Sequence, residues 1–257
     1  MQQNTSDPLL IVEQLTKQYG KLNAVDHIDL RVRAGEIVGL VGPNGAGKTT
    51  ALRCCVGILR PTSGQVLIAG HNLRTNEREA KRALAFVPEL PSLYPLLTIE
   101  EQIEFIARAY GPLIADFAEQ RAELLRRFDL WDQRRKLCGQ LSKGMRQKTA
   151  IAAAFLHSAQ VILLDEPLIG VDPSGARQLK ELIIEARSAG RAILVSTHLL
   201  DTAERLCDRI VIMQRGRVRA EGTLDELRTR LDRTHDTTLE EIFTELTSDP
   251  AAVAEEA

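Results

Sequence analysis

The sequence IVGLVGPNGAGKTT (residues 37–50) decides the fold of this chain. It opens with an apolar run typical of a buried strand, and Gly42–Thr49 then matches the phosphate-loop pattern G-x-x-x-x-G-K-[ST]. The apolar stretch ALRCCV at 51–56 follows directly and indicates a helix. A loop between a strand and a helix brings backbone N–H groups and the helix dipole together around an anion. The sequence therefore predicts an α/β fold that binds a nucleotide.

The residues of this loop are expected to hold the phosphates. Glycines let the backbone curl around them, Lys48 brings a positive charge to the β- and γ-phosphates, and the Thr49 hydroxyl can ligate Mg²⁺. An ordinary glycine-rich turn is the alternative, and the flanking strand and helix disfavour it. The residues predicted to bind nucleotide here are Gly42, Pro43, Asn44, Gly45, Ala46, Gly47, Lys48, Thr49 and Thr50.

The rest of the chain supports a mainly parallel core sheet. Continuous apolar runs, which a parallel sheet covered on both faces requires, recur at 83–88, 161–165, 192–196 and 210–213. The stretch before Gly35 alternates apolar and polar residues instead, which indicates antiparallel strands. We therefore expect an N-terminal antiparallel β-subdomain beside the core sheet.

Between about residues 96 and 157 the pattern changes to helices without strands. Thr98 and Glu101 form a capping-box pattern, and apolar residues follow at helical spacing. This predicts a helical subdomain inserted into the α/β core. We expect residues 9–247 to form a single domain, and the polar residues 248–257 to form a disordered tail.

Composition excludes several classes of protein. The 257 residues are 44% hydrophobic and 26% charged, as in ordinary globular proteins, and the formal net charge of -2 disfavours a nucleic-acid binder. No apolar run approaches the roughly 18 residues that span a bilayer, and the N-terminus lacks a signal-peptide pattern. The four cysteines have no metal-binding spacing and are expected to be small buried residues: Cys54, Cys55, Cys138 and Cys207.

A second motif carries two acids. The apolar strand VILLD at 161–165 ends in Asp165 and continues with Glu166. The carboxyl end of a parallel strand lies at the edge of the sheet where the phosphate loop also lies. We expect Asp165 to hold Mg²⁺ and Glu166 to polarise the attacking water.

The segment LSKGMRQK at 141–148 distinguishes among phosphate-loop proteins. It resembles the LSGGQ signature of the nucleotide-binding subunit of ATP-binding cassette (ABC) transporters. The resemblance implies that Ser142, Lys143, Gly144 and Met145 close over the ATP of a partner protomer in a head-to-tail dimer. Lys143 and Met145 depart from LSGGQ, in a form similar to the variant found in exporters of the ABC-2 type.

Other residues match motifs of the family, in the same order along the chain. Asp172 matches the loop that faces the partner across the dimer, and His198 matches the switch histidine that contacts the γ-phosphate. Tyr19 resembles the aromatic residue that stacks on adenine. Glu89 stands where the family usually has a glutamine that contacts Mg²⁺ and the attacking water, so it adds a negative charge near the metal.

The resemblance implies an ATPase motor for a membrane transporter, with ATP and Mg²⁺ as cofactors. Its expected partners are a separate transmembrane permease and either a second copy of this chain or a related ATPase subunit, with no nucleic acid. It is expected at the cytoplasmic face of the membrane as a peripheral subunit, in an exporter. The alternative is a soluble ABC ATPase that moves no solute. A basic cluster at 126–136 is interpreted as a solvated face rather than a docking patch.

Overall fold

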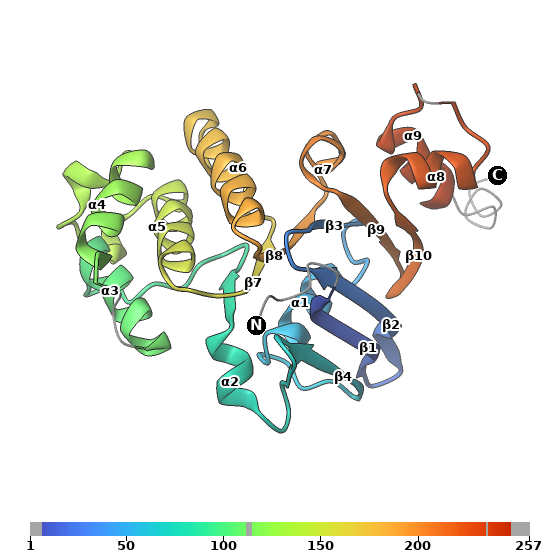
Figure 1. The fold of residues 1–257 in the computed structure, drawn as a ribbon, viewed down its shortest axis with the longest axis horizontal. Coiled ribbons are helices and arrows are strands. Elements are labelled where there is room, and N and C mark those ends of the chain that lie inside the picture. Colours follow the sequence, from blue (N-terminus) through green and yellow to red (C-terminus); the bar gives the residue numbers. More distant parts are fainter. Residues whose placement is uncertain (1–6, 112–114, 235, 248–257) are drawn as a thin grey trace.

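The computed structural model describes residues 7–111, 115–234 and 236–247. Its core is a six-stranded sheet with the order β10-β9-β3-β8-β7-β6 (Figure 1). Neighbours from β9 to β6 are parallel, and β10 pairs antiparallel with β9. All five predicted apolar strands are confirmed. The strands are β3 (Ile37–Val41), β6 (Leu84–Val87), β7 (Val161–Asp165), β8 (Ala192–Thr197), β9 (Arg209–Gln214) and β10 (Arg217–Gly222).

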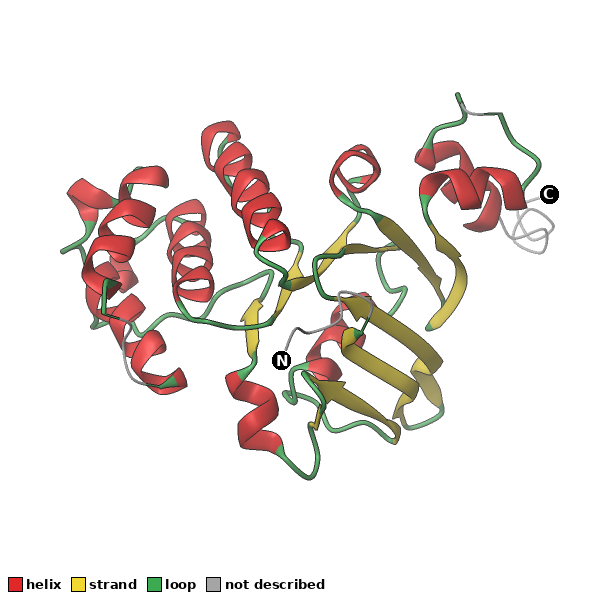
Figure 2. Cartoon of the chain, viewed as in Figure 1, coloured by secondary structure: helices red, strands yellow, loops and turns green. Residues whose placement is uncertain are grey.

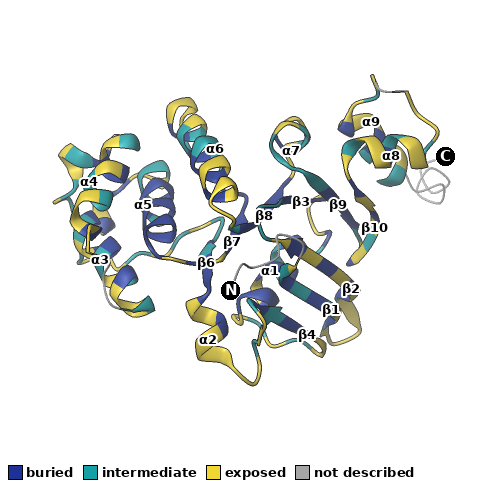
Figure 3. Cartoon of the chain, in the orientation of Figure 1, coloured by how far each residue is buried: buried dark blue, intermediate teal, exposed yellow. Residues whose placement is uncertain are grey.

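Helices cover both faces of this sheet: α1 (Lys48–Cys55), α6 (Pro173–Ser188) and α7 (Leu200–Leu206). Ile193 and Val195 of β8 pack in one core with Leu179 of α6, whereas Leu194 packs in a second core with Leu52 of α1. Successive residues of a strand point to opposite faces, which explains why these runs are apolar throughout. The burial pattern can be followed in Figure 3, since the central strands β3, β7 and β8 are buried throughout.

The predicted antiparallel subdomain is a four-stranded sheet with the order β2-β1-β4-β5. Its first two strands precede the phosphate loop, as the alternating pattern predicted, and the other two follow α1. Helix α2 (Glu77–Arg82) then leads into the core sheet. The strands are β1 (Pro8–Tyr19), β2 (Leu22–Arg33), β4 (Ser63–Ile68) and β5 (His71–Asn72).

The inserted subdomain consists of helices among the residues that the structure describes, with one isolated bridge from Thr98 to Leu137 (Figure 2). The capping box of Thr98 and Glu101 is confirmed at the first helix. Ser142 caps the last helix by accepting a hydrogen bond from the Met145 N–H. The helices are α3 (Ile99–Tyr110), α4 (Phe117–Arg127) and α5 (Lys143–Leu156), with short 3-10 turns at Trp131–Gln133 and Cys138–Gln140.

Two C-terminal helices, α8 (Leu224–Arg230) and α9 (Leu239–Thr247), complete the described chain. Leu239 and Ile242 of α9 pack against Ala203 of α7. The expected tail at 248–257 lies outside the described residues. No helix among the described residues has the length and apolar character needed to cross a bilayer.

Two expectations need correction. The basic cluster is only partly solvated, because Arg127 is bound to Glu181 and Glu185 of α6 and so ties the helical subdomain to the core. Arg126 and Arg134 lie over the Trp131 ring at 4.4 and 4.2 Å. Among the cysteines, three are buried as expected, and Cys207 is partly exposed.

Candidate nucleotide-binding site

The phosphate loop joins β3 to α1. Gly47 adopts φ 103° at the N-cap of α1, a conformation that glycine allows, and a Cβ there would meet the Ala24 carbonyl oxygen. Lys48 is buried, and its ammonium donates to the carbonyl oxygens of Gly42 at 2.6 Å and Pro43 at 3.2 Å. The lysine therefore lies within the curl of its own loop, where a phosphate would receive its charge.

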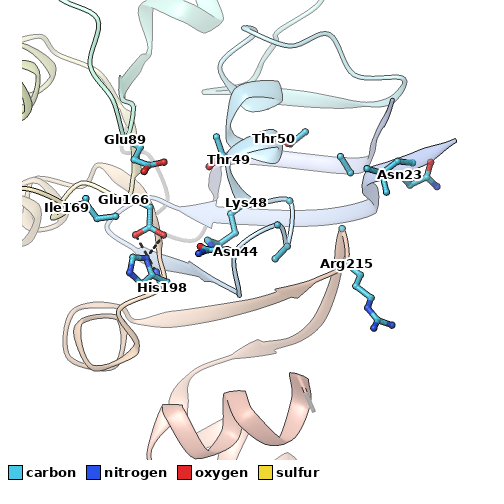
Figure 4. A pocket seen from close by; sticks show the side chains of 16 residues that line it. Asn23, Asn44, Lys48, Thr49, Thr50, Glu89, Glu166, Ile169, His198 and Arg215 are labelled. Atoms are coloured by element: carbon cyan, nitrogen blue, oxygen red, sulfur yellow. Dashed lines mark hydrogen bonds and ion pairs between the residues drawn. The ribbon is translucent and has the colours of Figure 1, made fainter. Parts of the chain in front are cut away.

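A cleft of about 630 Å³ opens beside this loop (Figure 4). Its volume lies in the range of small-molecule sites. Loop residues form one wall, and residues that follow strands β6, β7 and β8 form the opposite wall. The cleft is lined by Leu22, Asn23, Ala24, Asn44, Gly45, Ala46, Gly47, Lys48, Thr49, Thr50, Glu89, Glu166, Ile169, His198, Arg215 and Gly216.

Asp165 lies at the end of β7, where its carboxylate meets two hydroxyls. Its Oδ1 accepts from the Ser196 hydroxyl at 2.5 Å and from the Thr49 hydroxyl at 3.3 Å. The parallel pairing of β7 with β8 sets Asp165 opposite Ser196 and fixes this arrangement. The structure thus confirms that the phosphate loop and the acidic strand meet at one edge of the sheet.

Glu166 follows with a left-handed φ of 46°, and its N–H donates to the Ser196 carbonyl at 3.0 Å. Its Oε1 lies 3.0 Å from His198 Nδ1, and the His198 backbone N–H points to Oε2 at 3.4 Å. The side chain of Glu166 is 9% exposed, whereas that of His198 is 46% exposed. The histidine therefore holds a mostly buried carboxylate at the rim of the cleft.

Three carboxylates act on the buried ammonium of Lys48. Burial lowers the pKa of Lys48 below its ordinary value, and the charges of Glu166, Asp165 and Glu89 act against that shift. Glu89 follows β6 and lines the cleft, so the acidic replacement faces the same space as the phosphate loop.

The donor set suits a magnesium–nucleotide complex. Thr49 and Asp165 already converge within 3.3 Å, and hydroxyl and carboxylate oxygens are the ligands that Mg²⁺ prefers. A Cβ placed on Gly45 would meet no atom within 4 Å, so the loop is open at that point. The residues present therefore fit both ATP and its metal.

Comparison with known proteins places the chain in a family. Residues 25–169 match the family described as ABC transporter. The chain belongs to the ABC transporter family. The ABC-type transporter ATP-binding protein EcsA of Bacillus subtilis is 36% identical over 243 residues, 95% of this chain and 98% of that protein. The daunorubicin resistance ATP-binding protein DrrA3 of Streptomyces coeruleorubidus is 37% identical over 87% of this chain and 71% of its own length.

Solved structures agree with this assignment. An ATP-binding subunit of an ABC transporter superposes with a TM-score of 0.90 at 39% identity, over 93% of this chain and all of that one. An ATP-binding cassette in a dimeric, post-hydrolysis state bound to ADP and phosphate gives a TM-score of 0.75 at 27% identity, over 84% and 98%. The ABC ATPase fold is confirmed, and this chain is an ATP-binding, ATP-hydrolysing subunit.

Several residues predicted for the ABC ATPase site lie away from the cleft. Of the described residues that line it, none comes from the first turn of α5, which carries Ser142, Lys143, Gly144 and Met145. Tyr19, at the end of β1, is 47% exposed and is not among the described lining residues either. The Lys17 ammonium lies 5.0 Å from its ring centroid.

Asp172 also lies outside the cleft, and it makes two contacts within the chain. It caps α6 through a hydrogen bond from the Gly175 N–H, and its carboxylate pairs with the Lys148 ammonium. This pairing lowers the pKa of Asp172 below its ordinary value.

The sequence interpretation missed one wall of the cleft. Asn23 and Ala24 of β2 and the turn Arg215–Gly216 line it, and none of these residues was predicted to bind nucleotide. The Gly216 N–H donates to the Ala46 carbonyl at 2.9 Å, so the turn is attached to the phosphate loop. The glycine in a strand-to-strand turn was the available signal, but it did not reveal which loop the turn contacts.

Proposed function

We propose that this ABC ATPase drives an exporter whose membrane-spanning part is a separate permease. It works as a head-to-tail dimer with two ATP between the protomers, at the cytoplasmic face of the membrane. The observation that carries this proposal is the division of the predicted ATP-binding residues into two sets. Most residues of the phosphate loop line the cleft, whereas Ser142, Lys143, Gly144 and Met145 at the start of α5 lie outside it, and a second protomer would bring the two groups together.

Each functional residue of the ATP site has a separate role in ATP binding or hydrolysis. Lys48 holds the β- and γ-phosphates, and Thr49 and Asp165 would hold Mg²⁺, which when bound neutralises charge on those phosphates. Glu166 orients the attacking water and accepts its proton. His198 keeps the Glu166 carboxylate in place through Nδ1. In the proposed complex its ring also contacts the γ-phosphate. Tyr19, which lies outside the cleft at the end of β1, would stack on the adenine.

The partner protomer supplies the remaining contacts. Ser142 and Gly144 lie at the N-terminus of α5, a helix of 14 residues whose first N–H groups favour an anion. In the dimer these groups meet the γ-phosphate held by the other chain, with Lys143 and Met145 beside them. Asp172 lies at the same face, at the start of α6.

An apolar surface next to Glu89 supports docking of a permease. Four large apolar side chains are exposed here, and the ring centroids of Tyr94 and Phe105 lie 4.9 Å apart; the four residues are Leu90, Tyr94, Leu96 and Phe105. Phe105 lies on α3 and the other three residues precede that helix, and we call the four together the α3 patch. Clustered exposed apolar residues are typical of protein interfaces. Relatives named for bacitracin transport and daunorubicin resistance support an exporter.

Recovery of the tagged chain from native membranes tests this function. The parent is expected to co-purify in detergent with an integral membrane protein, and Leu96→Asp in the α3 patch is expected to lose it. Ile184→Asp is the matched control, since Ile184 of α6 is 48% exposed away from the patch. Recovery of the parent without any membrane protein, together with ATPase activity, would instead support the soluble alternative.

A further inference from the structure

The first two turns of α5 lie against the segment that follows the catalytic strand, residues 166–172. A Cβ on Gly144 would lie 2.6 Å from the Gly170 carbonyl oxygen, so the two backbones touch. The Lys143 stem in turn lies 3.3 Å from the position of a Cβ on Gly170, which has φ 79°. The turn predicted to reach the partner's ATP therefore rests on the chain's own segment beyond Glu166.

Lys148 makes the principal polar link between these two elements. Its side chain is 10% exposed and its ammonium contacts Asp172, which is 50% exposed. The stem passes Gly175 so closely that a Cβ there would lie 2.5 Å from Lys148 Cε. A buried ammonium requires a partner, and the glycine at 175 leaves room for the lysine to reach one.

A second contact between α5 and this segment lies deeper. Gln147 is 1% exposed and its Nε2 donates to the Pro167 carbonyl at 3.4 Å. Its Oε1 has no hydrogen-bond partner among the described residues. This long, half-satisfied contact is weaker than the ion pair, so Lys148 is the stronger tether.

The tethered segment is short and held at both ends. Glu166 is fixed to β8 through Ser196 at one end, and Asp172 is fixed to α5 through Lys148 at the other. Only five residues lie between them. A shift of the α5 N-terminus therefore moves a segment that begins at the catalytic carboxylate.

From these contacts we infer that Lys148 is a positioning residue that couples the two ATP sites of the dimer. When the α5 N-terminus engages the partner's ATP, the Lys148–Asp172 pair transmits its position to Glu166 of the same chain. Each protomer then hydrolyses its ATP efficiently only when the other site is also engaged. This inference rests on the proposed dimer, because α5 is taken to contact the partner's nucleotide.

The test uses the full-length chain with Lys148→Met, which keeps the stem and removes the charge. Cooperative hydrolysis by two coupled sites gives a Hill coefficient up to about 2, and loss of coupling brings it to about 1 with turnover falling about tenfold. ATP affinity of the monomer is expected to be unchanged. Asp172→Asn, which keeps a capping oxygen, is expected to give the same losses, and the double variant no further loss.

Two variants serve as controls. Lys148→Arg keeps the charge and is expected to retain cooperativity. Lys81→Met breaks an exposed pair with Glu77 on α2, 2.7 Å long, and is expected to behave as the parent. Parental turnover and Hill coefficient in Lys148→Met would overturn the inference. So would equal losses in Lys148→Arg, or a tenfold weaker monomer affinity for ATP in Lys148→Met.

The failure of this inference differs from the failure of the proposed dimer. If the parent hydrolyses ATP cooperatively and Glu166→Gln dimerises with ATP, the dimer stands, and the Lys148 variants alone decide the coupling. If the parent shows neither property, the dimer itself is wrong, and the coupling falls with it.

Discussion

His198 holds both carboxylate oxygens of Glu166, with its Nδ1 3.0 Å from Oε1 and its backbone N–H 3.4 Å from Oε2. The two residues follow adjacent parallel strands, β7 and β8, so their approach is fixed by the register of the core sheet. The carboxylate is oriented by a neighbour before nucleotide arrives. A carboxylate held by a neighbour in its own chain suits a general base, because part of its orientation is fixed before the reaction.

Glu166→Gln is expected to reduce ATP turnover by about 10²-fold or more, because an amide cannot accept the proton of the attacking water. Nucleotide binding is expected to persist, so the variant accumulates as a dimer on size exclusion with ATP but not with ADP. Glu79→Gln, on the exposed side of α2, is the control. Parental turnover in Glu166→Gln, or an oligomeric state that ignores the nucleotide, would contradict the assigned role.

Ser142→Arg is expected to stop hydrolysis while leaving ATP binding by the monomer nearly intact, because the bulky cation blocks the face toward the partner. Ser142 also caps α5, and loss of a cap costs about 1 kcal/mol of stability. Thr223→Arg removes the matching cap of α8 and is the control for that cost. Isothermal titration with the non-hydrolysable analogue of ATP measures binding. Loss of binding by the monomer would show that Ser142 serves its own nucleotide.

Glu89→Gln is expected to raise the Mg²⁺ concentration for half-maximal hydrolysis several-fold, with ATP affinity changed less. The reason is that Glu89 shares the cleft with Lys48, and an amide is a weaker ligand for Mg²⁺ than a carboxylate. Glu100→Gln on α3 is the control. Normal Mg²⁺ dependence with loss of permease-stimulated activity would instead assign Glu89 to coupling with the membrane partner.

The sequence predicted the parts of the fold and site that depend on local patterns. The apolar runs of the core sheet, the capping residue Thr98, and the meeting of Thr49 with Asp165 follow from rules about strand ends and helix starts. Parallel strands bring their carboxyl ends to one edge, so motifs far apart in the chain could be placed together. The residues of the cleft that follow β3, β7 and β8 were predictable for this reason.

The missed features depend on contacts that no local pattern encodes. Arg217 of β10 binds Asp26 of β2 at 2.6 Å, which brings the neighbouring Arg215–Gly216 turn beside Asn23 and the phosphate loop. This ion pair joins strands of two different sheets, and neither strand carries a sequence motif that predicts its contact with the other. The same is true of Arg127, whose ion pairs with α6 became visible only in the folded chain.

A final prediction concerns His157, which ends α5 and is buried where the helical subdomain meets the core. Its ring stacks on Tyr110 of α3 with centroids 4.0 Å apart, and burial, with a smaller effect of the Arg191 charge, lowers its pKa from 6.5 to about 4. The folded state thus resists protonation more than the unfolded state. Neutral His157 therefore makes its full contribution to stability above its pKa in the unfolded chain, 6.5, and this contribution is lost as pH falls toward 4.

His157→Phe keeps a planar ring against Tyr110 and removes the titration. The parent is expected to lose about 2 kcal/mol more unfolding free energy than the variant between pH 7 and pH 5, from the linkage of the two pKa values. Urea unfolding at the two pH values measures the difference, and carboxylates common to both proteins cancel in it. His71→Phe, on the exposed strand β5, is expected to show the parental pH dependence. Equal losses in the parent and in His157→Phe would mean that His157 is readily protonated in the folded protein, and that the subdomain junction does not exclude its charge.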